Sequence, residues 1–421
     1  MKAKIFSVLF LIVLLLASFA CSFPLDLGLG SAPSLTPASV HPNQPDEDEE
    51  KPAESLPQTR TATEESTATA TLSPTADLPV FISPQIFSIH MFSPDRGWAV
   101  AEDSNRLLVT KDGGETWLDV TPPDLLPLPT GVTSLWLQPF FLDGNTAWFT
   151  PSTAAGTLFQ TEDAGQTWLT AALPFERPRF FFLDLTTGFV LEDLGAGAGS
   201  HYVALHRTLD GGETWTEVFS HEPGEIKSLP GSGTKNGVTF INLDRGFIGG
   251  SIPMEDHFHF YVTNDGGATW SQETDISLPG TFSGSFLDAW QPIFIDETQG
   301  VLPVRAVGSG NGSPLLIYRS EDAGETWAFQ GSVPDGQDVD FISGMEGWIA
   351  GDAGLFKTVD EGLTWEAVVT AGIPAGEDFL KVDFVDGDHG WLLTYLENGA
   401  ETSRKLSQTD DGGESWILLQ P

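Results

Sequence analysis

The sequence predicts an all-β protein, a seven-bladed β-propeller whose blades are four-stranded and antiparallel. Two observations carry this prediction. A motif of the form Ser/Thr-x-Asp-x-Gly-x-Thr/Ser-Trp occurs seven times, and a second pattern rich in Phe, Gly and Trp precedes each copy. Successive motif tryptophans are 51, 47, 55, 57, 38 and 51 residues apart. A period in this range is typical of repeat architectures.

The motif is expected to form the turn between strands three and four of each blade. Its Asp can accept hydrogen bonds from main-chain N–H groups one or two residues on, and its Gly reaches backbone conformations that strain other residues. Its Trp brings a large apolar area and one N–H donor. The motif aspartates are Asp112, Asp163, Asp210, Asp265, Asp322, Asp360 and Asp411. The motif tryptophans are Trp117, Trp168, Trp215, Trp270, Trp327, Trp365 and Trp416.

The second pattern, aromatic-x-Asp/Asn/Ser-x-x-x-Gly-aromatic, predicts a hairpin between strands one and two. Phe384, Asp386, Gly390 and Trp391 form one copy. The first two copies are looser, starting at Met91 and at Phe141. We call this pattern the landmark.

The sixth blade gives the shortest version of the unit. Its four strands are predicted at Asp338–Ile342, Gly347–Gly351, Gly354–Thr358 and Thr364–Val369. Four antiparallel strands in fewer than about forty residues, with hardly any helical periodicity, are typical of one propeller blade.

Seven units fill residues 84–421, within a predicted propeller domain of residues 81–421. Only Ile417–Pro421 follow the last motif, so strand four of the last blade must be short. We expect Leu78–Ser83 to pair beside that strand and close the ring.

The first twenty residues have the features of a secretory signal peptide. Two lysines precede an apolar run from Ile5 to Ala20, which ends in small residues before Cys21. This boundary resembles the lipobox of bacterial lipoproteins, which implies that Cys21 is the site of lipid attachment. The alternatives are an uncleaved membrane anchor or a plain signal peptide. Residues 21–80 are rich in Thr, Pro, Ser and Glu, so we expect a disordered acidic tether.

Charge excludes one class of partner. The chain has a formal net charge of −40, and residues 81–421 hold 15 Lys and Arg against 49 Asp and Glu. Phosphate recognition depends on Lys and Arg, so this domain is expected to bind no nucleic acid and to contact the membrane only through its lipid anchor. We expect a monomer outside the cytoplasm, anchored to the bacterial cell membrane at the cell surface or in the periplasm.

The seven motifs resemble the Asp-box, or bacterial neuraminidase, repeat of sialidases, sortilin-type receptors and xyloglucanases. Together with the landmark, they are most similar to the photosystem II assembly and stability factor family of plastids and cyanobacteria and its non-photosynthetic bacterial relatives. The resemblance covers residues 84–421 and implies a non-enzymatic, protein-binding propeller. Photosynthetic members carry a basic patch, so the acidic domain argues against a direct photosystem role.

Two enzyme classes use related repeats. Sialidases require three arginines, a Tyr nucleophile with a Glu partner and an Asp, and their Arg-Ile-Pro sequence is absent. Arg207 and Arg319 lie on strands that enter a motif, where they fit an arginine triad poorly. Other glycoside hydrolases need two carboxylates across the sugar, and the sequence leaves that open. Xyloglucanases with these repeats use two propellers, and this chain has room for one.

One segment holds potential metal ligands, and two segments are rich in glycine. Asp256, His257 and His259 could supply metal ligands because alternate residues of a strand share a face. The alternative is a surface loop between strands two and three of the fourth blade. Gly195–Ser200 and Gly308–Ser313 lack the context of a phosphate loop and are expected to be hairpin loops. We assign no catalytic residue, cofactor or metal.

The sequence therefore predicts a lipid-anchored scaffold, or an assembly or stability factor, with an unknown protein partner or glycan. The segments Trp136–Phe141, Phe175–Phe182 and Phe286–Phe294 hold aromatics outside the repeat pattern and could form the partner surface. The alternative is that they fill the blade cores. The competing function is a secreted glycoside hydrolase or carbohydrate-binding propeller, which two facing carboxylates beside a stacking Trp would favour.

Overall fold

The computed structural model divides the chain into two units, Met1–Ala62 and Thr63–Pro421. The residues it describes all lie in the second unit: 69–71, 78–101, 105–126, 135, 137–151, 156–175, 177–308, 312–398 and 401–419. The expected signal peptide, Cys21, most of the tether and Trp136 lie outside these residues. Within them, no helix has the length and apolar character needed to span a membrane.

The described residues form antiparallel sheets and two short 3-10 helices, η1 (Pro123–Leu125) and η2 (Gly280–Phe282). The first sheet, in the order β2-β6-β5-β4-β3, contains β2 (Val80–Phe81), β3 (Ile86–Met91), β4 (Gly97–Ala101), β5 (Arg106–Thr110) and β6 (Trp117–Asp119). The second, in the order β1-β10-β9-β8-β7, contains β1 (Thr69–Thr71), β7 (Leu137–Phe141), β8 (Ala147–Pro151), β9 (Thr157–Thr161) and β10 (Trp168–Ala172). The third contains β11 (Pro178–Phe182), β12 (Gly188–Gly197), β13 (Ser200–Thr208) and β14 (Thr216–Ser220).

A nine-stranded sheet follows and contains two four-stranded runs. The first run is β15 (Thr239–Phe240), β16 (Gly246–Glu255), β17 (His259–Thr263) and β18 (Ser271–Gln272). The second run is β20 (Ile293–Phe294), β21 (Gly300–Val307), β22 (Leu315–Ser320) and β23 (Ala328–Val333). The strand β19 (Phe286–Ala289) pairs with both β16 and β21 and joins the two runs.

Two four-stranded sheets complete the chain. One contains β24 (Gly336–Phe341), β25 (Gly347–Gly351), β26 (Gly354–Thr358) and β27 (Glu366–Val368). The other contains β28 (Asp378–Phe384), β29 (Gly390–Asn398), β30 (Glu401–Thr409) and β31 (Ile417–Leu418). The prediction of an all-β protein built from four-stranded antiparallel sheets is confirmed.

The landmark and the motif are joined by the strand register. In the third sheet, Phe182 pairs with Gly188, which pairs with the first motif residue, Thr208. The last sheet repeats this with Phe384, Gly390 and Thr409. A Cβ at Gly188 or Gly390 would lie 2.4 Å from the Phe ring of its own sheet. The glycine is therefore required because the aromatic ring packs directly over its Cα.

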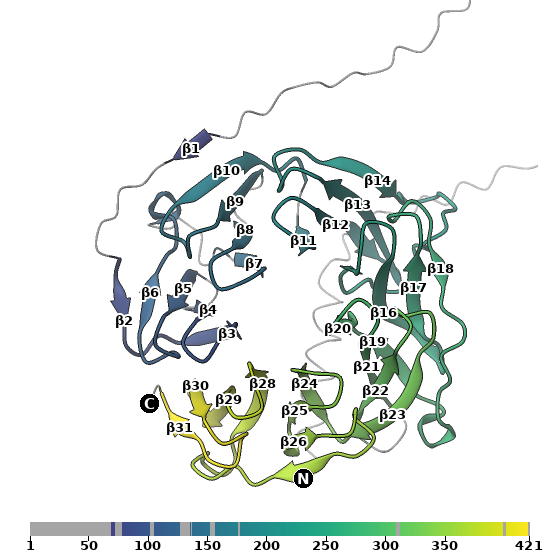
Figure 1. Cartoon of the computed structure of the whole chain (residues 1–421). Coiled ribbons are helices and arrows are strands. Elements are labelled where there is room, and N and C mark those ends of the chain that lie inside the picture. The colour runs from purple at the N-terminus through teal and green to yellow at the C-terminus, as the bar shows by residue number, and fades with distance from the viewer. Residues whose placement is uncertain are drawn as a thin grey trace, which may run out of the picture. The chain divides into compact units, whose positions relative to one another are not determined.

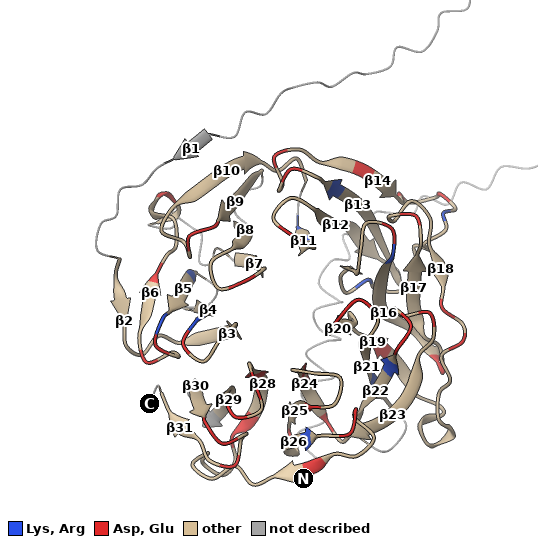
Figure 2. Ribbon diagram, viewed as in Figure 1, with Lys and Arg blue, Asp and Glu red and all other residues tan. Residues whose placement is uncertain are grey.

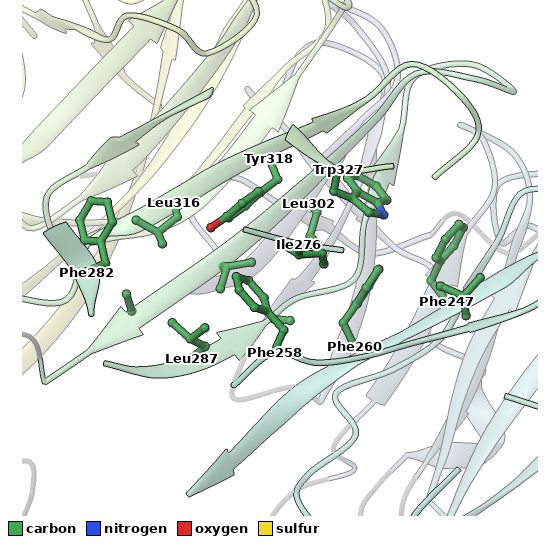
Figure 3. Close-up of a cluster of buried hydrophobic side chains, with 14 residues drawn as sticks. Phe247, Phe258, Phe260, Ile276, Phe282, Leu287, Leu302, Leu316, Tyr318 and Trp327 are labelled. Carbon is green, nitrogen blue, oxygen red and sulfur yellow. The ribbon is translucent and has the colours of Figure 1, made fainter. Parts of the chain in front are cut away.

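Aromatic stacking connects neighbouring sheets. Trp148 of β8 stacks on Phe182 of the next sheet with ring centroids 3.8 Å apart, and Trp348 of β25 stacks on Phe384 at 3.7 Å. Between the two runs of the nine-stranded sheet, Phe247, Phe260 and Trp327 are packed with other buried side chains (Figure 3). Phe182 and Phe384 thus each lie between the glycine of their own sheet and a Trp of the preceding one.

The sheets of the second unit follow one another around a ring, and the last sheet contacts the first (Figure 1). Strands β28 and β30 contact β3, and a hydrophobic cluster that includes Met91, Trp117 and Trp391 spans the junction. The prediction that Leu78–Ser83 pairs beside the last strand is wrong. Val80 and Phe81 pair instead with Leu118 and Trp117 of β6, as an extra strand of the first sheet. Side-chain packing across the junction takes the place of a shared strand.

Three landmark tryptophans donate a hydrogen bond to the motif of the following sheet. Trp148 Nε1 donates to Gly211 O at 2.9 Å and Trp348 Nε1 to Gly412 O at 3.2 Å. At the ring junction Trp391 Nε1 donates to Gly113 O at 2.7 Å. Because all three bonds are buried, each satisfies a carbonyl that water does not reach.

Replacing Trp391 by Phe tests this bond at the ring junction. Phe occupies the same landmark position at Phe189 and Phe247, so the ring fits while the N–H is lost. We expect W391F to lower the free energy of unfolding by about 1–3 kcal/mol, because a buried carbonyl loses its donor. Urea unfolding of the full chain measures this, and W391A should cost about 3–5 kcal/mol. Equal stability of W391F and the wild type would contradict this role.

Candidate functional site

The landmark turns and the motifs lie together at one end of each repeat. In all seven, the residue after the motif Asp donates its N–H to a landmark carbonyl, as Gly113 does to Asp95 (2.9 Å) and Glu361 to Met345 (3.0 Å). The tryptophan bonds connect these turns from sheet to sheet. We call the surface formed by the seven landmark turns and seven motifs the turn face.

Each motif Asp is held by the same set of hydrogen bonds. In the first motif, Thr110 Oγ1 donates to Asp112 Oδ1 (2.9 Å) and accepts the N–H of Gly114 (2.8 Å). Thr116 donates its N–H to Asp112 Oδ1 (2.9 Å) and its hydroxyl to Oδ2 (2.6 Å). The bonds between Asp and the threonines or serines recur in the other six motifs. The expected N–H donors were one or two residues on, but the donor lies four residues on because the loop folds back over the carboxylate.

These bonds keep the motif aspartates ionised. For Asp112 burial opposes ionisation, but the hydrogen bonds from Thr116 outweigh it and lower the pKa. The hydroxyl and N–H of Ser415 lower the pKa of Asp411 to about 2. The turn-face segments hold 24 Asp and Glu against three Lys and Arg, and Figure 2 shows acidic residues on many loops between strands. The turn face is therefore strongly negative at neutral pH.

A second group of carboxylates lies on the innermost strands β24 and β28 (Figure 1). Asp340 Oδ2 accepts the N–H of Phe384 at 2.6 Å, and Asp338 Oδ2 accepts that of Val382 at 3.0 Å. Asp383 Oδ1 accepts the N–H of Met91 at 3.1 Å, across the ring junction. These carboxylates bond the innermost strand of one sheet to that of the next.

Lys381 and His90 face this set, which we call the inner carboxylates (Asp338, Asp340 and Asp383). Lys381 Nζ lies 3.7 Å from Asp338 Oδ2, and His90 Nδ1 lies 3.4 Å from Asp383 Oδ2. Burial and then the charge of Asp383 raise the pKa of Asp340 to about 7. Asp338 beside it raises the pKa of Lys381.

A proton-holding carboxyl next to a carboxylate is an arrangement that general acid catalysis uses. Here, however, one oxygen of each inner carboxylate is occupied by a main-chain N–H, which gives all three a structural task. Asp338 and Asp340 lie on a strand, as the sequence predicts, but their bonds to the next sheet were not predicted. The sequence does hold a signal for these bonds. Asp338 and Asp340 occupy alternate positions of β24, and Lys381 and Asp383 occupy alternate positions of β28.

The three candidate metal ligands, Asp256, His257 and His259, each have a different environment in the structure. Asp256 lies between β16 and β17 and accepts the N–H of Gly284 (2.6 Å) and the hydroxyl of Ser283 (3.0 Å). His257 Nε2 lies 3.2 Å from Gln272 Nε2. His259 is fully buried, and burial lowers its pKa to about 3. Within the described residues, no three His, Cys, Asp or Glu side chains are grouped to hold a metal ion.

The aromatic segments proposed as a partner surface are largely packed inside. Phe175 and Phe182 belong to the cluster between the second and third sheets, and Phe140 packs against it. Phe286 is the exception, with 43% of its surface exposed. The loop Gly195–Ser200 forms the expected extended hairpin between β12 and β13, closed where Gly197 pairs with Ser200. In the second glycine-rich segment, Gly308–Ser313, residues 309–311 lie outside the described residues.

No protein-family profile matches this chain. The photosystem II assembly lipoprotein Ycf48 of Synechococcus sp. (strain CC9902) is 24% identical over 288 residues, which are 62% of this chain and 79% of Ycf48. This chain is homologous to Ycf48. A xyloglucanase from Paenibacillus sp is 25% identical over 250 residues, or 51% of this chain. The match spans only 23% of the xyloglucanase.

The structure of YCF48 bound to D1 peptide matches with a TM-score of 0.48 and 18% identity, covering 77% of this chain and 96% of that one. Ycf48 is a β-propeller, and this chain has the antiparallel four-stranded sheets of that architecture.

Replacing Asp163 tests the motif network. D163A should lower the free energy of unfolding by about 2–3 kcal/mol, because a buried threonine and a main-chain N–H lose their acceptor. D163N should cost less, since its amide oxygen still accepts. The lowered pKa of Asp163 stabilises the fold above the unfolded value near 4, so the difference from D163N should shrink as pH falls below that value and vanish once pH is below the lowered pKa of the folded state. Thermal unfolding from pH 2 to 8 measures this, with E162Q as the neighbouring-charge control.

Asp340 should show the opposite pH dependence. Its pKa is raised to about 7, so its contribution is most favourable below the unfolded value near 4 and is lost as pH rises through 7. We expect D340N to be more stable than the wild type by about 1–2 kcal/mol at pH 8, because Asn keeps the acceptor without the charge. At pH 4 the two should be equal. A loss of stability at pH 8 would show that the ionised carboxylate is the stabilising form.

Proposed function

We propose that this chain is a lipid-anchored, extracytoplasmic β-propeller that binds a protein partner as an assembly or stability factor. The observation that carries the proposal is the homology to Ycf48, whose length is covered to 79%. The xyloglucanase match reaches only 23% of that enzyme, so most of the catalytic protein has no counterpart in the match. The structure of YCF48 with a bound peptide supports a protein as the kind of partner.

The proposed architecture has seven blades with Asp-box turns between strands three and four. Seven landmark–motif pairs support it. The nine-stranded sheet holds two of these pairs, one in each four-stranded run, and each of the other five sheets holds one. In the domain boundaries we propose, residues 1–20 are a signal peptide, residues 21–80 a tether starting at Cys21, and residues 81–421 the propeller. Ycf48 is a lipoprotein, which supports a lipid on Cys21.

A glycoside hydrolase is the second candidate, and one observation favours it. Asp340 carries a raised pKa next to Asp383, which is the kind of acid–carboxylate pair that sugar hydrolysis requires. The xyloglucanase match adds a polysaccharide as the class of substrate to test. In this alternative Asp340 would be the acid and Asp383 the carboxylate.

The test uses the full chain in its native cells. We expect radiolabelled palmitate to be incorporated and C21A to remove both the label and the membrane association. Deleting the gene should lower the amount of one membrane complex on blue-native gels. The wild type should restore that complex, and C21A should restore it less well. Purified protein should release no reducing ends from xyloglucan.

Two results would overturn the proposal. Membrane complexes that are unchanged in the deletion strain would remove the assembly role. Release of reducing ends that D340N abolishes, while D184N on the turn face leaves it intact, would establish the glycoside hydrolase instead.

A further inference from the structure

A groove lies between the β24–β27 sheet and the last sheet. Its volume is about 610 Å³, and its walls are the outermost strand β27 and the motif of the following sheet. The chain after β27 is bonded to the last sheet: Ala371 forms a parallel bridge with Ser415, and Trp416 donates its N–H to Ala371 O at 2.8 Å. Backbone bonds therefore join the two sheets that form the walls of the groove.

The wall of the groove and its rim are unusually apolar for the turn face. Val359 is 63% exposed, Leu363 57% and Val369 82%, and Met345 beside them is half exposed. In the other motifs the position of Val359 is Lys111, Glu162, Leu209, Asn264, Glu321 or Asp410. The position of Leu363 is Glu115, Gln166, Glu213, Ala268, Glu325 or Glu414. The turn uses neither side chain, so folding does not explain why both are apolar here, and exposed apolar patches of this kind often mark interaction sites.

Carboxylates surround this apolar surface. Glu366, Asp411 and Glu414 line the groove, and Asp411 stays ionised because its pKa is lowered to about 2. The one cation of the lining, Lys357, is already used: its Nζ lies 2.7 Å from Glu346 Oε1 and 4.7 Å from the centre of the Trp348 ring. A ligand that neutralises the groove must therefore bring its own positive charges.

The strand β27 also offers a backbone edge. It is the last strand of its sheet and, within the described residues, pairs with β26 alone. This protein covers the corresponding edge of two other sheets with added strands, β2 on β6 and β1 on β10. An exposed edge beside side-chain pockets is the surface that extended peptides bind by strand addition.

We propose that this groove binds an extended segment of the partner protein in which apolar residues alternate with Lys or Arg. The segment adds to the edge of β27, its apolar side chains contact Val359 and Val369, and its cations face Glu366 and Glu414. This inference rests on the proposed scaffold function and names the chemistry that its partner must carry.

The test measures binding of fluorescein-labelled hexapeptides to the full chain by fluorescence anisotropy. The probe is Lys-Val-Lys-Val-Lys-Val, compared with the Glu-Val and Ser-Val peptides of the same length. We expect the Lys-Val peptide to bind at least about tenfold more tightly than the other two, and E366K/E414K to weaken it at least about tenfold. V359S/V369S should weaken it about three- to tenfold.

The matched control is E115K/E325K, which changes the same charge at the position of Glu414 in two other motifs. It should bind as the wild type does. If the control loses binding to the same extent, the net charge alone attracts the peptide and the proposal is overturned. Tight binding of the Glu-Val peptide, or no binding of the Lys-Val peptide, would also overturn it. If E366K/E414K still restores the membrane complex of the deletion strain, the groove is excluded as the partner-binding site while the scaffold function stands. If the wild type does not restore the complex, the scaffold function itself fails.

Discussion

The fold depends on one repeated contact, an aromatic ring packed over a glycine and under the aromatic ring of the preceding sheet. Phe182 and Phe384 each lie in this position, with a glycine of their own sheet on one side and a stacked Trp on the other. The same register places the first motif residue next to that glycine. One contact therefore fixes the hairpin, the start of the motif and the spacing to the next sheet, and aromatic packing of this kind stabilises the ring without disulfides.

The chemistry of the turns follows from this packing. Because the ring holds the landmark and the motif at one end of each sheet, their carboxylates gather on one face of the molecule. The motif aspartates avoid the cost of burial by accepting several hydrogen bonds each, which lowers their pKa. The inner carboxylates have fewer donors, and burial of Asp340, followed by the charge of Asp383 beside it, raises the pKa of Asp340. Both sets of carboxylates have structural tasks, and this weakens the argument that either is a catalytic pair.

Local patterns allowed much of the fold to be predicted. In the β24–β27 sheet, the second and third strands begin and end where the alternation and the glycines at 347, 351 and 354 predict. The ring junction could not be predicted, because both pairing of Val80–Phe81 with β6 and pairing with β31 satisfy the same short apolar pattern. Packing of Trp391 and Trp117 across the junction decides between them, and that contact joins residues far apart in the sequence. The role of Asp340 and Asp383 was missed for the same reason.

A repeat protein can change its partner only at positions that its fold leaves free. In the motif, the first, third, fifth, seventh and eighth residues form the turn or the core. The fourth has a positive φ and donates its N–H to the landmark, so the second and sixth can vary. Most copies fill these two positions with polar or charged side chains, which suit a solvated face. The motif after β26 has Val359 and Leu363 there, next to a groove and an uncovered strand edge. Since neither residue contributes to the turn, their apolar character is better explained by a contact with another molecule than by folding, and the acidic surroundings restrict that molecule to one with positive charge.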